Sequence, residues 1–175
     1  MAHPRFTLAR RKATQLLRAA RVKRAPVPVE RLAHFVGAKI HFEPFDGGIS
    51  GLVHRPPQGP IIIGVNSSHA RTRQRFTIAH ELGHLILHRN ELFHVDESPV
   101  IRFRNEESSL ATNAEEIEAN QFASELLMPD HLLSKELSRL PGNMSAEDAI
   151  PILARRFQVS EQALTLRLTR SGVLA

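Results

Sequence analysis

Two histidines four residues apart, with a glutamate beside the first, have the spacing that most clearly suggests chemistry in this chain. The sequence His80-Glu81-Leu82-Gly83-His84 lies in a segment with a helical pattern. Residues i and i+4 of a helix share one face, about 6 Å apart along the axis, so two imidazoles can hold one zinc ion at about 2.0–2.1 Å. Glu81 is offset around the helix, where it can take a proton from a metal-held water and pass it to a leaving amine. The pattern predicts a zinc-dependent peptidase with Glu81 as its general base.

The helix that carries this pattern, predicted from Arg71 to His88, is otherwise apolar on every side, which is typical of a buried helix. Polar residues buried in such a helix without partners would be costly. A metal site is therefore favoured over a helix with satisfied core histidines. Gly83, between the two histidines, would let a neighbouring element approach closely.

A zinc site of this kind needs a third protein ligand and an open position for water. His88 would stretch the three histidines over about 12 Å of helix axis, too far for one ion, so we expect it to cap the helix or to hydrogen-bond in the core. A second predicted helix, from Asn113 to Met128, is the better source. At about 100° per residue, Glu116 points inward with the apolar stripe, whereas Glu118 and Glu125 fall on the solvent side. Glu116 is the predicted third ligand, and Glu118 is the second choice.

Two neighbours of Glu116 have different predicted tasks. Asn120, one turn later, can accept the N–H of a ligating histidine and so fix its tautomer. Glu115 ends the sequence Thr112-Asn113-Ala114-Glu115, which has the form of a capping box at the start of the helix. A local role for Glu115 leaves Glu116 as the carboxylate available to the metal.

The composition excludes several other chemistries. The 175 residues include no Cys and no Tyr, so no thiolate can bind metal and no phenol can stabilise an oxyanion. No apolar run is long enough to span a membrane, and the N-terminus lacks the apolar core of a secretory signal. We expect a cytoplasmic protein that uses Zn²⁺, or Mn²⁺, and no small-molecule cofactor. The oxyanion stabiliser stays open between backbone N–H groups and the side chains of His41, His54, His69, His94 and Arg71.

The positive charge is concentrated at the N-terminus. Residues 1–31 contain nine Lys or Arg and one Glu, a net charge of +8 within a chain of net charge +5. This segment is interpreted as a solvated helix face, or as a surface for an acidic partner or nucleic acid.

The element pattern predicts an α+β fold. Three strands, at 39–45, 49–54 and 60–65, are joined by short turns, which favours a small, mostly antiparallel sheet. Helices are predicted at 6–22, 29–36, 71–88, 113–128 and 130–140, with a further short strand at 100–103. We expect a peptidase domain over residues 1–142 and a separate helical unit over 143–175, with helices at 145–157 and 161–170. Pro151 is predicted to kink or split the first of these two helices.

Two long motifs in this order resemble the ImmA/IrrE family of metallo-endopeptidases. They are Arg75-Phe-Thr-Ile-Ala-His-Glu-Leu-Gly-His-Leu-Ile-Leu-His88 and Glu115-Glu-Ile-Glu-Ala-Asn-Gln-Phe-Ala-Ser-Glu-Leu-Leu-Met-Pro129. The resemblance implies a minimal zincin fold, with His80, His84 and Glu116 as zinc ligands and Glu81 as the base. It also implies a protein substrate, a helix-turn-helix (XRE-like) repressor or antitoxin whose cleavage switches on stress, phage-defence or mobile-element genes.

The resemblance also bears on where a partner docks. In zincins the substrate strand adds to a sheet edge above the metal helix, and residues 50–54 are the predicted edge. The tail from Ile152 to Leu168 looks like a helix-turn-helix whose second helix carries Arg167 and Arg170, so weak DNA contact and packing against a partner are both open. The alternative to a peptidase is a non-proteolytic or signal-gated binding module with a structural zinc site.

Overall fold

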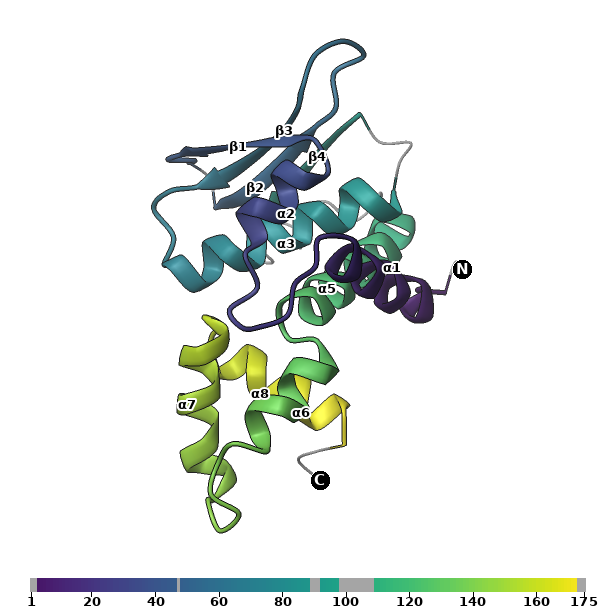
Figure 1. The fold of residues 1–175 in the computed structure, drawn as a ribbon. Helices are drawn as coiled ribbons and strands as arrows, with labels where there is room; N and C mark the ends of the chain where they lie inside the picture. The colour runs from purple at the N-terminus through teal and green to yellow at the C-terminus, as the bar shows by residue number, and fades with distance from the viewer. Residues whose placement is uncertain (1–2, 47, 89–91, 98–108, 173–175) are drawn as a thin grey trace.

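The computed structural model describes residues 3–46, 48–88, 92–97 and 109–172. The elements in chain order are α1 (Phe6–Ala19), α2 (Val29–Phe35), β1 (Ala38–Glu43), β2 (Ile49–His54), β3 (Ile61–Asn66), α3 (Arg71–Leu87), β4 (Phe93–Glu97), α5 (Ser109–Leu127), α6 (Asp130–Leu137), α7 (Ala146–Phe157) and α8 (Glu161–Arg170). Figure 1 shows the sheet on one side of α3, with α1 and α5 on the other side and α6 to α8 furthest from the sheet. The predicted α+β class is confirmed.

The sheet has four described strands in the order β1-β3-β2-β4, so the predicted number of three strands is wrong, whereas two of the three pairings are antiparallel, as predicted. The β1 and β3 strands pair in parallel, because β3 inserts between β1 and β2. The additional strand, β4, pairs antiparallel with β2. The most apolar run, Ile61-Ile62-Ile63, thus takes a central place in the sheet, where Ile63 is fully buried. The predicted short strand at 100–103 lies outside the described residues.

This strand order also corrects the predicted docking edge. Residues 50–54 belong to β2, which is paired with β3 on one side and β4 on the other. Among the described strands, β4 is the edge strand next to β2. Any strand added on that side would pair with β4 rather than with β2.

The helix α3 is buried through its centre. Every residue from Thr77 to Leu85 is buried, as the apolar pattern predicted. Its C-terminal carbonyl groups are capped from the sheet, because Arg55 donates from Nη1 to the His88 carbonyl oxygen at 2.9 Å and from Nη2 to that of His84 at 2.7 Å. A cation at the C-terminus of a helix also opposes the helix dipole. The residue after β2 therefore holds the end of the helix that carries His84.

The helix α5 begins at Ser109, so the predicted capping box at 112–115 lies inside the helix and that prediction is wrong. The placement of Glu118 and Glu125 on the solvent side is also wrong, because both are buried. The reason is that α5 packs against α3 and also against α1, and that arginines from distant parts of the chain pair with the two glutamates. Glu118 pairs with Arg5 at 2.8 Å and Glu125 with Arg167 at 2.7 Å.

The C-terminal helices are joined to the rest of the molecule by buried arginines. Arg75 of α3 donates from Nη2 to the Val27 carbonyl oxygen at 2.8 Å and from Nε to the Gln158 carbonyl oxygen, between α7 and α8, at 3.2 Å. The helix α7 runs unbroken through Pro151, so a split there is excluded. The interpretation of α7 and α8 as a helix-turn-helix stays a prediction.

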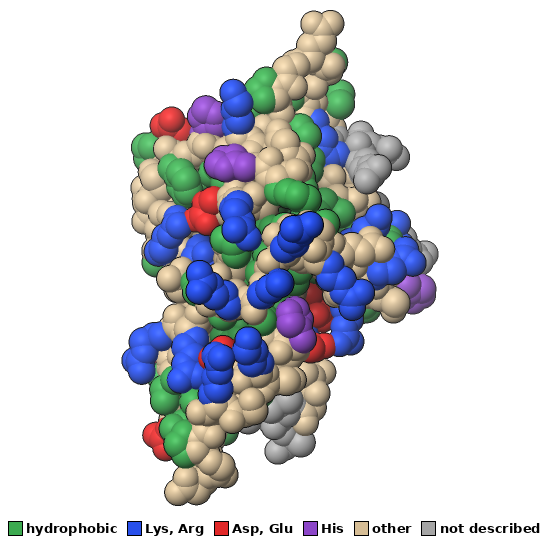
Figure 2. All heavy atoms as spheres, viewed as in Figure 1, with side chains coloured by type: hydrophobic (Ala, Val, Ile, Leu, Met, Phe, Trp, Pro, Cys, Tyr) green, Lys and Arg blue, Asp and Glu red, His purple; other side chains and the backbone are tan. Residues whose placement is uncertain are grey.

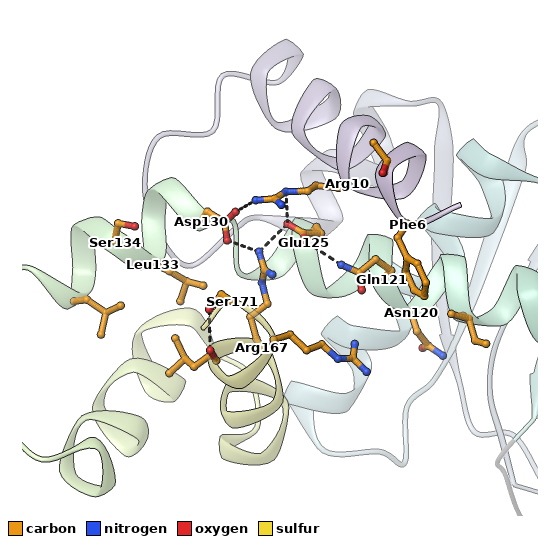
Figure 3. Close-up of a pocket in the computed structure, with 15 residues that line it drawn as sticks. Phe6, Arg10, Asn120, Gln121, Glu125, Asp130, Leu133, Ser134, Arg167 and Ser171 are labelled. Atoms are coloured by element: carbon orange, nitrogen blue, oxygen red, sulfur yellow. Dashed lines mark hydrogen bonds and ion pairs between the residues drawn. The ribbon is translucent and has the colours of Figure 1, made fainter. Parts of the chain in front are cut away.

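Arg167 lies under α5 and α6 instead of facing outward. Its Nη2 donates to Glu125 Oε2 at 2.7 Å and to Asp130 Oδ1 at 2.6 Å (Figure 3). Only 5% of its surface is exposed, whereas Arg170 is exposed. Of the two arginines through which the tail could contact DNA, only Arg170 is therefore accessible. These ion pairs line a pocket of about 980 Å³ between α1, α5, α6 and α8.

Substituting Arg167 by Met should destabilise the fold by about 3–5 kcal/mol, because Glu125 would remain buried without its main cationic partner. Burial already raises the pKa of Glu125, and Arg167 opposes that rise. We expect a clear fall in the thermal unfolding midpoint. Arg170→Met, three residues along on the exposed side of α8, is the matched control. Equal midpoints for the two variants would contradict a stabilising role of the buried pair.

No helix in the described part of the chain combines the length and the apolar character that a membrane crossing requires.

Candidate metal centre

Three elements bring four possible metal ligands together. His80 and His84 come from α3, His94 from β4 and Glu116 from α5, and one ligand atom from each lies within 4.8 Å of the others. Three of these residues are buried, and His94 is partly buried. The histidines of α3 and the glutamate of α5 meet because α3 and α5 pack directly on each other.

The spacing of the ligand atoms fits a metal ion. Four atoms placed tetrahedrally at zinc bond lengths lie about 3.3 Å apart. Here His80 Nε2 and His84 Nε2 are 3.1 Å apart, and they lie 3.5 and 3.3 Å from the two Glu116 carboxylate oxygens. Imidazole and carboxylate donors suit zinc, and they also accept other divalent transition metals. The group can therefore hold a metal, while the geometry leaves the identity of the metal open.

The charges of the site match what metal ligation needs. Burial, reinforced by the neighbouring His80 and His94, lowers the pKa of His84 to about 3, although Glu116 opposes the shift. Burial alone would raise the pKa of Glu116, but hydrogen bonds with His84 and His94 outweigh it and the pKa falls below its ordinary value. Near neutral pH, His84 is neutral and Glu116 is ionised, which are the forms that bind a metal.

The ring nitrogens that face away from the centre have partners of their own. His80 Nδ1 lies 3.1 Å from Asn120 Oδ1. Because an amide oxygen can only accept a hydrogen bond, His80 carries its proton on Nδ1. Its Nε2, which faces the centre, is therefore unprotonated. His84 Nδ1 lies 3.1 Å from Nδ1 of His88, which is itself outside the group of possible ligands. The sequence expectation that His88 hydrogen-bonds in the core agrees with these positions.

His94 is a site residue that the sequence did not single out as a ligand. Its Nε2 lies 3.1 Å from Glu116 Oε1, and its ring stacks on His84 with centroids 3.6 Å apart. No strand was predicted over residues 92–97, so the orientation of the His94 side chain was not predictable. The alternation in Phe93-His94-Val95 was the available signal, and the pairing of His94 with Val53 of β2 fixes its side.

The other side chains that were candidates for stabilising the oxyanion lie outside the group of possible metal ligands. His41 is exposed on β1, and His54 makes an edge contact with Phe93. Arg71 pairs with Glu30 at the start of α3. His69 precedes α3, and the pKa of its imidazole is lowered by burial and by Arg73. Among the described histidines outside α3, His94 is the one in the group of possible ligands.

Glu81 lies next to the centre on the side of the sheet. Its side chain is fully buried, and it forms a second close group with His80 and Asp96 of β4. Its Oε1 lies 3.3 Å from the position that a Cβ at Gly51 would take. Since that Cβ would also lie 2.3 Å from Thr77 Cγ2, only glycine lets β2 pass so close to α3. Neither Gly51 nor Asp96 had been identified from the sequence.

Gly83 sets the distance between the two helices that carry the possible ligands. A Cβ there would lie 3.0 Å from Ala119 Cα and 3.2 Å from its carbonyl oxygen, both on the backbone of α5. We expect Gly83→Ala to lower stability, because overpacking costs about 1–3 kcal/mol while the gain in helix propensity is about 1 kcal/mol. It should also weaken zinc binding by shifting Glu116.

The measurements for Gly83→Ala are thermal unfolding and zinc titration. Gly142→Ala is the control, because a Cβ at Gly142 meets no atom within 4 Å. Wild-type zinc affinity in Gly83→Ala would show that the close approach of α5 does not set the site.

Comparison with known proteins places the chain in a family. Residues 34–169 match the model of the IrrE N-terminal-like domain, Peptidase_M78. No curated protein matches the chain in sequence. A solved structure described as a Mycobacterium tuberculosis transcriptional regulator is similar, with a TM-score of 0.62 and 17% sequence identity. The similarity covers 93% of this chain and 46% of the regulator, so this chain spans less than half the length of that protein. At this identity the likeness concerns the fold alone. Because the family model covers most of its length, including both predicted motifs, the chain belongs to the IrrE N-terminal-like (Peptidase_M78) family.

Proposed function

We propose that this chain is a metal-dependent endopeptidase with His80, His84 and Glu116 as metal ligands and Glu81 as general base. The observation that carries the proposal is the packing of Glu81 beside a group of buried imidazole and carboxylate donors at metal-ligand spacing. A structural site would need no buried carboxylate beside its ligands, and burying one is costly. Membership of a peptidase family supports the same reading.

The chain's own residues have defined tasks in this reaction. A zinc ion, when bound, lowers the pKa of water to about 7 and polarises a peptide carbonyl. The Glu81 carboxylate removes a proton from the attacking water and delivers it to the nitrogen of the leaving amine. Asn120 keeps the proton of His80 on Nδ1, so that Nε2 stays available for the metal.

His94 is proposed to stabilise the oxyanion, a role left vacant by the absence of tyrosine. It faces the centre from the edge strand, and a hydrogen-bond donor there would stabilise the negative charge that develops on the substrate carbonyl oxygen. We expect His94→Ala to lower the cleavage rate by about 10²–10³-fold without loss of zinc. A gain in activity would instead mark His94 as a fourth ligand that closes the site. Rates and zinc content of the variant decide between the two roles.

The proposed substrate is a helix-turn-helix repressor or antitoxin in the same cytoplasm. The resemblance to the family supports this class of substrate. An extended substrate segment would pair with β4, at the edge of the described sheet. Leu92 and Phe93, 61% and 56% exposed at the start of that strand, offer an apolar surface beside His94.

The proposal is tested by mixing the protein with Zn²⁺ or Mn²⁺ and with helix-turn-helix regulators from the same genome, tested one at a time. Mass mapping should show cleavage at one site in the regulator and none in an unrelated folded protein. Removal of the metal by a chelator should stop the reaction, and added zinc should restore it. An intact regulator at every metal concentration would overturn the peptidase proposal.

A second candidate, a binding module without proteolysis, has one observation in its favour. Figure 2 shows Lys and Arg side chains spread across the middle of one face of the molecule. The exposed basic residues of α1, α2 and the segment between them are Arg10, Arg11, Arg18, Arg21, Lys23, Arg24 and Arg31. Such a surface suits an acidic partner or the phosphates of nucleic acid. Tight, salt-sensitive binding of operator DNA without cleavage would favour this candidate.

A further inference from the structure

Two buried polar residues next to the metal centre are not used by the proposed reaction. His88, at the end of α3, and Glu118, on α5, are 5% and 3% exposed, and neither belongs to the group of possible ligands. They are in contact with each other, with His88 Nε2 3.1 Å from Glu118 Oε2. They also connect the metal centre to the segment that precedes α1.

The far end of this connection is Arg5. Its backbone N–H donates to Glu118 Oε1 at 2.7 Å, its Nε donates to the same oxygen at 2.9 Å, and its Nη2 donates to Oε2 at 2.8 Å. The guanidinium of Arg5 is a permanent cation that donates to both carboxylate oxygens of Glu118, an arrangement typical of an ionised carboxylate. Glu118 is therefore an ionised carboxylate near neutral pH, and it can only accept hydrogen bonds.

Because the Glu118 carboxylate can only accept, it determines which nitrogen donates in each hydrogen bond from His88 back to His84. His88 must donate from Nε2 to Glu118, so a neutral His88 has its lone pair on Nδ1. His84 Nδ1, 3.1 Å away, must then be the donor to His88. The proton of His84 is thereby held on Nδ1, and its Nε2, which faces His80 and Glu116, is left with a lone pair.

We propose that Arg5, Glu118 and His88 are positioning residues that hold His84 in the tautomer able to bind a metal. The segment before α1 is thus part of the metal centre, although it lies outside the matched residues 34–169. The inference rests on the proposed metal role of His84, but it does not depend on peptide cleavage. Partners of this kind change metal affinity by about 10–100-fold in other metal sites.

A purely structural role for Arg5, as an ion pair that holds α1 against α5, is the competing explanation. Arg10 supplies the matched control, because it also reaches from α1, lies 3.9 Å from Glu125 and pairs with Asp130, but does not contact His88. Arg5 and Arg10 have similarly exposed side chains, at 54% and 59%. Substituting either arginine by Met removes its contacts with the carboxylates of α5 and α6, and only the Arg5 substitution interrupts the connection to His84.

The experiment compares wild type, Arg5→Met, Arg5→Lys, Glu118→Gln and Arg10→Met, all as full chains. Zinc affinity, measured with Zn²⁺ alone by chelator competition, should fall about 10–100-fold in Arg5→Met and Glu118→Gln. Arg10→Met should bind as wild type does, and Arg5→Lys should recover part of the loss because lysine, unlike methionine, retains the positive charge beside Glu118. In the zinc-free wild type, ¹⁵N–¹H correlation spectra of the imidazoles should place the His84 proton on Nδ1.

Several outcomes would overturn the inference. One is a wild-type zinc affinity in Arg5→Met, and another is a His84 proton on Nε2 in the zinc-free wild type. An equal loss of affinity in Arg5→Met and Arg10→Met would assign Arg5 a structural role. Failure of the wild type to bind zinc would remove the proposed metal function as well, whereas normal zinc binding without peptide cleavage would leave this inference standing.

Discussion

Glu81→Gln is expected to reduce peptide cleavage by at least about 10²–10⁴-fold while the protein keeps its fold and its metal. The amide has nearly the size of the carboxylate, so it fits the same fully buried position, but it cannot accept the proton of the attacking water. Metal should be retained because His80, His84, His94 and Glu116 form a group of possible ligands that is complete without Glu81. The measurements are the initial rate of regulator cleavage and the zinc content of the purified variant.

The control for this substitution is Glu43→Gln, which makes the same chemical change on the exposed end of β1. It should cleave at the wild-type rate. Normal cleavage by Glu81→Gln would show that another group is the base, and loss of zinc together with activity would show that Glu81 acts as a ligand.

Lowering the pH from about 7 toward 4 should progressively destabilise the zinc-free protein. The pKa of His84 is about 3 in the folded chain, because of burial, against an ordinary value of 6.5. Between these values the unfolded chain binds a proton that the folded chain does not, so stability is full above 6.5 and is lost as the pH falls. One such group gives a slope of at most about 1.4 kcal/mol per pH unit.

Glu118 adds to this acid sensitivity over a lower range of pH. The pKa of its carboxyl group falls from 4.5 to about 2, so its contribution is present above 4.5 and is lost toward 2. Urea unfolding at a series of pH values measures both contributions. His84→Gln should flatten the curve between 6.5 and 3 relative to His41→Gln, which changes an exposed histidine of β1. An unchanged slope in His84→Gln would contradict this assignment.

The parts of the structure that the sequence predicted are those set by local periodicity. The i, i+4 spacing placed His80 and His84 on one face, and the angular position of Glu116 on its helix turned it toward them. The helix boundaries from α6 to α8 also lie close to the predicted ones, because Pro129 and the N-caps Ser145 and Ser160 are local signals.

The parts that the sequence did not predict depend on contacts between distant segments. Glu118 and Glu125 looked like solvent-facing residues because their partners, Arg5 and Arg167, are 113 and 42 positions away. His94 joins the centre only through the pairing of β4 with β2. The position of β3 between β1 and β2 cannot be read from an alternation of apolar and polar residues, because that alternation is the same for any strand order. Helical angles describe one helix at a time, and these contacts are properties of the assembled fold.

The origin of the ligands on α3, β4 and α5 has a consequence for the lifetime of the protein. An ion bound there joins segments that are separate in the unfolded chain, so each tenfold rise in free zinc above the dissociation constant would add about 1.4 kcal/mol to folding stability. A chain made under zinc starvation would unfold more often and be degraded sooner. The cellular amount of this protein would then follow the zinc supply, without any change in its synthesis.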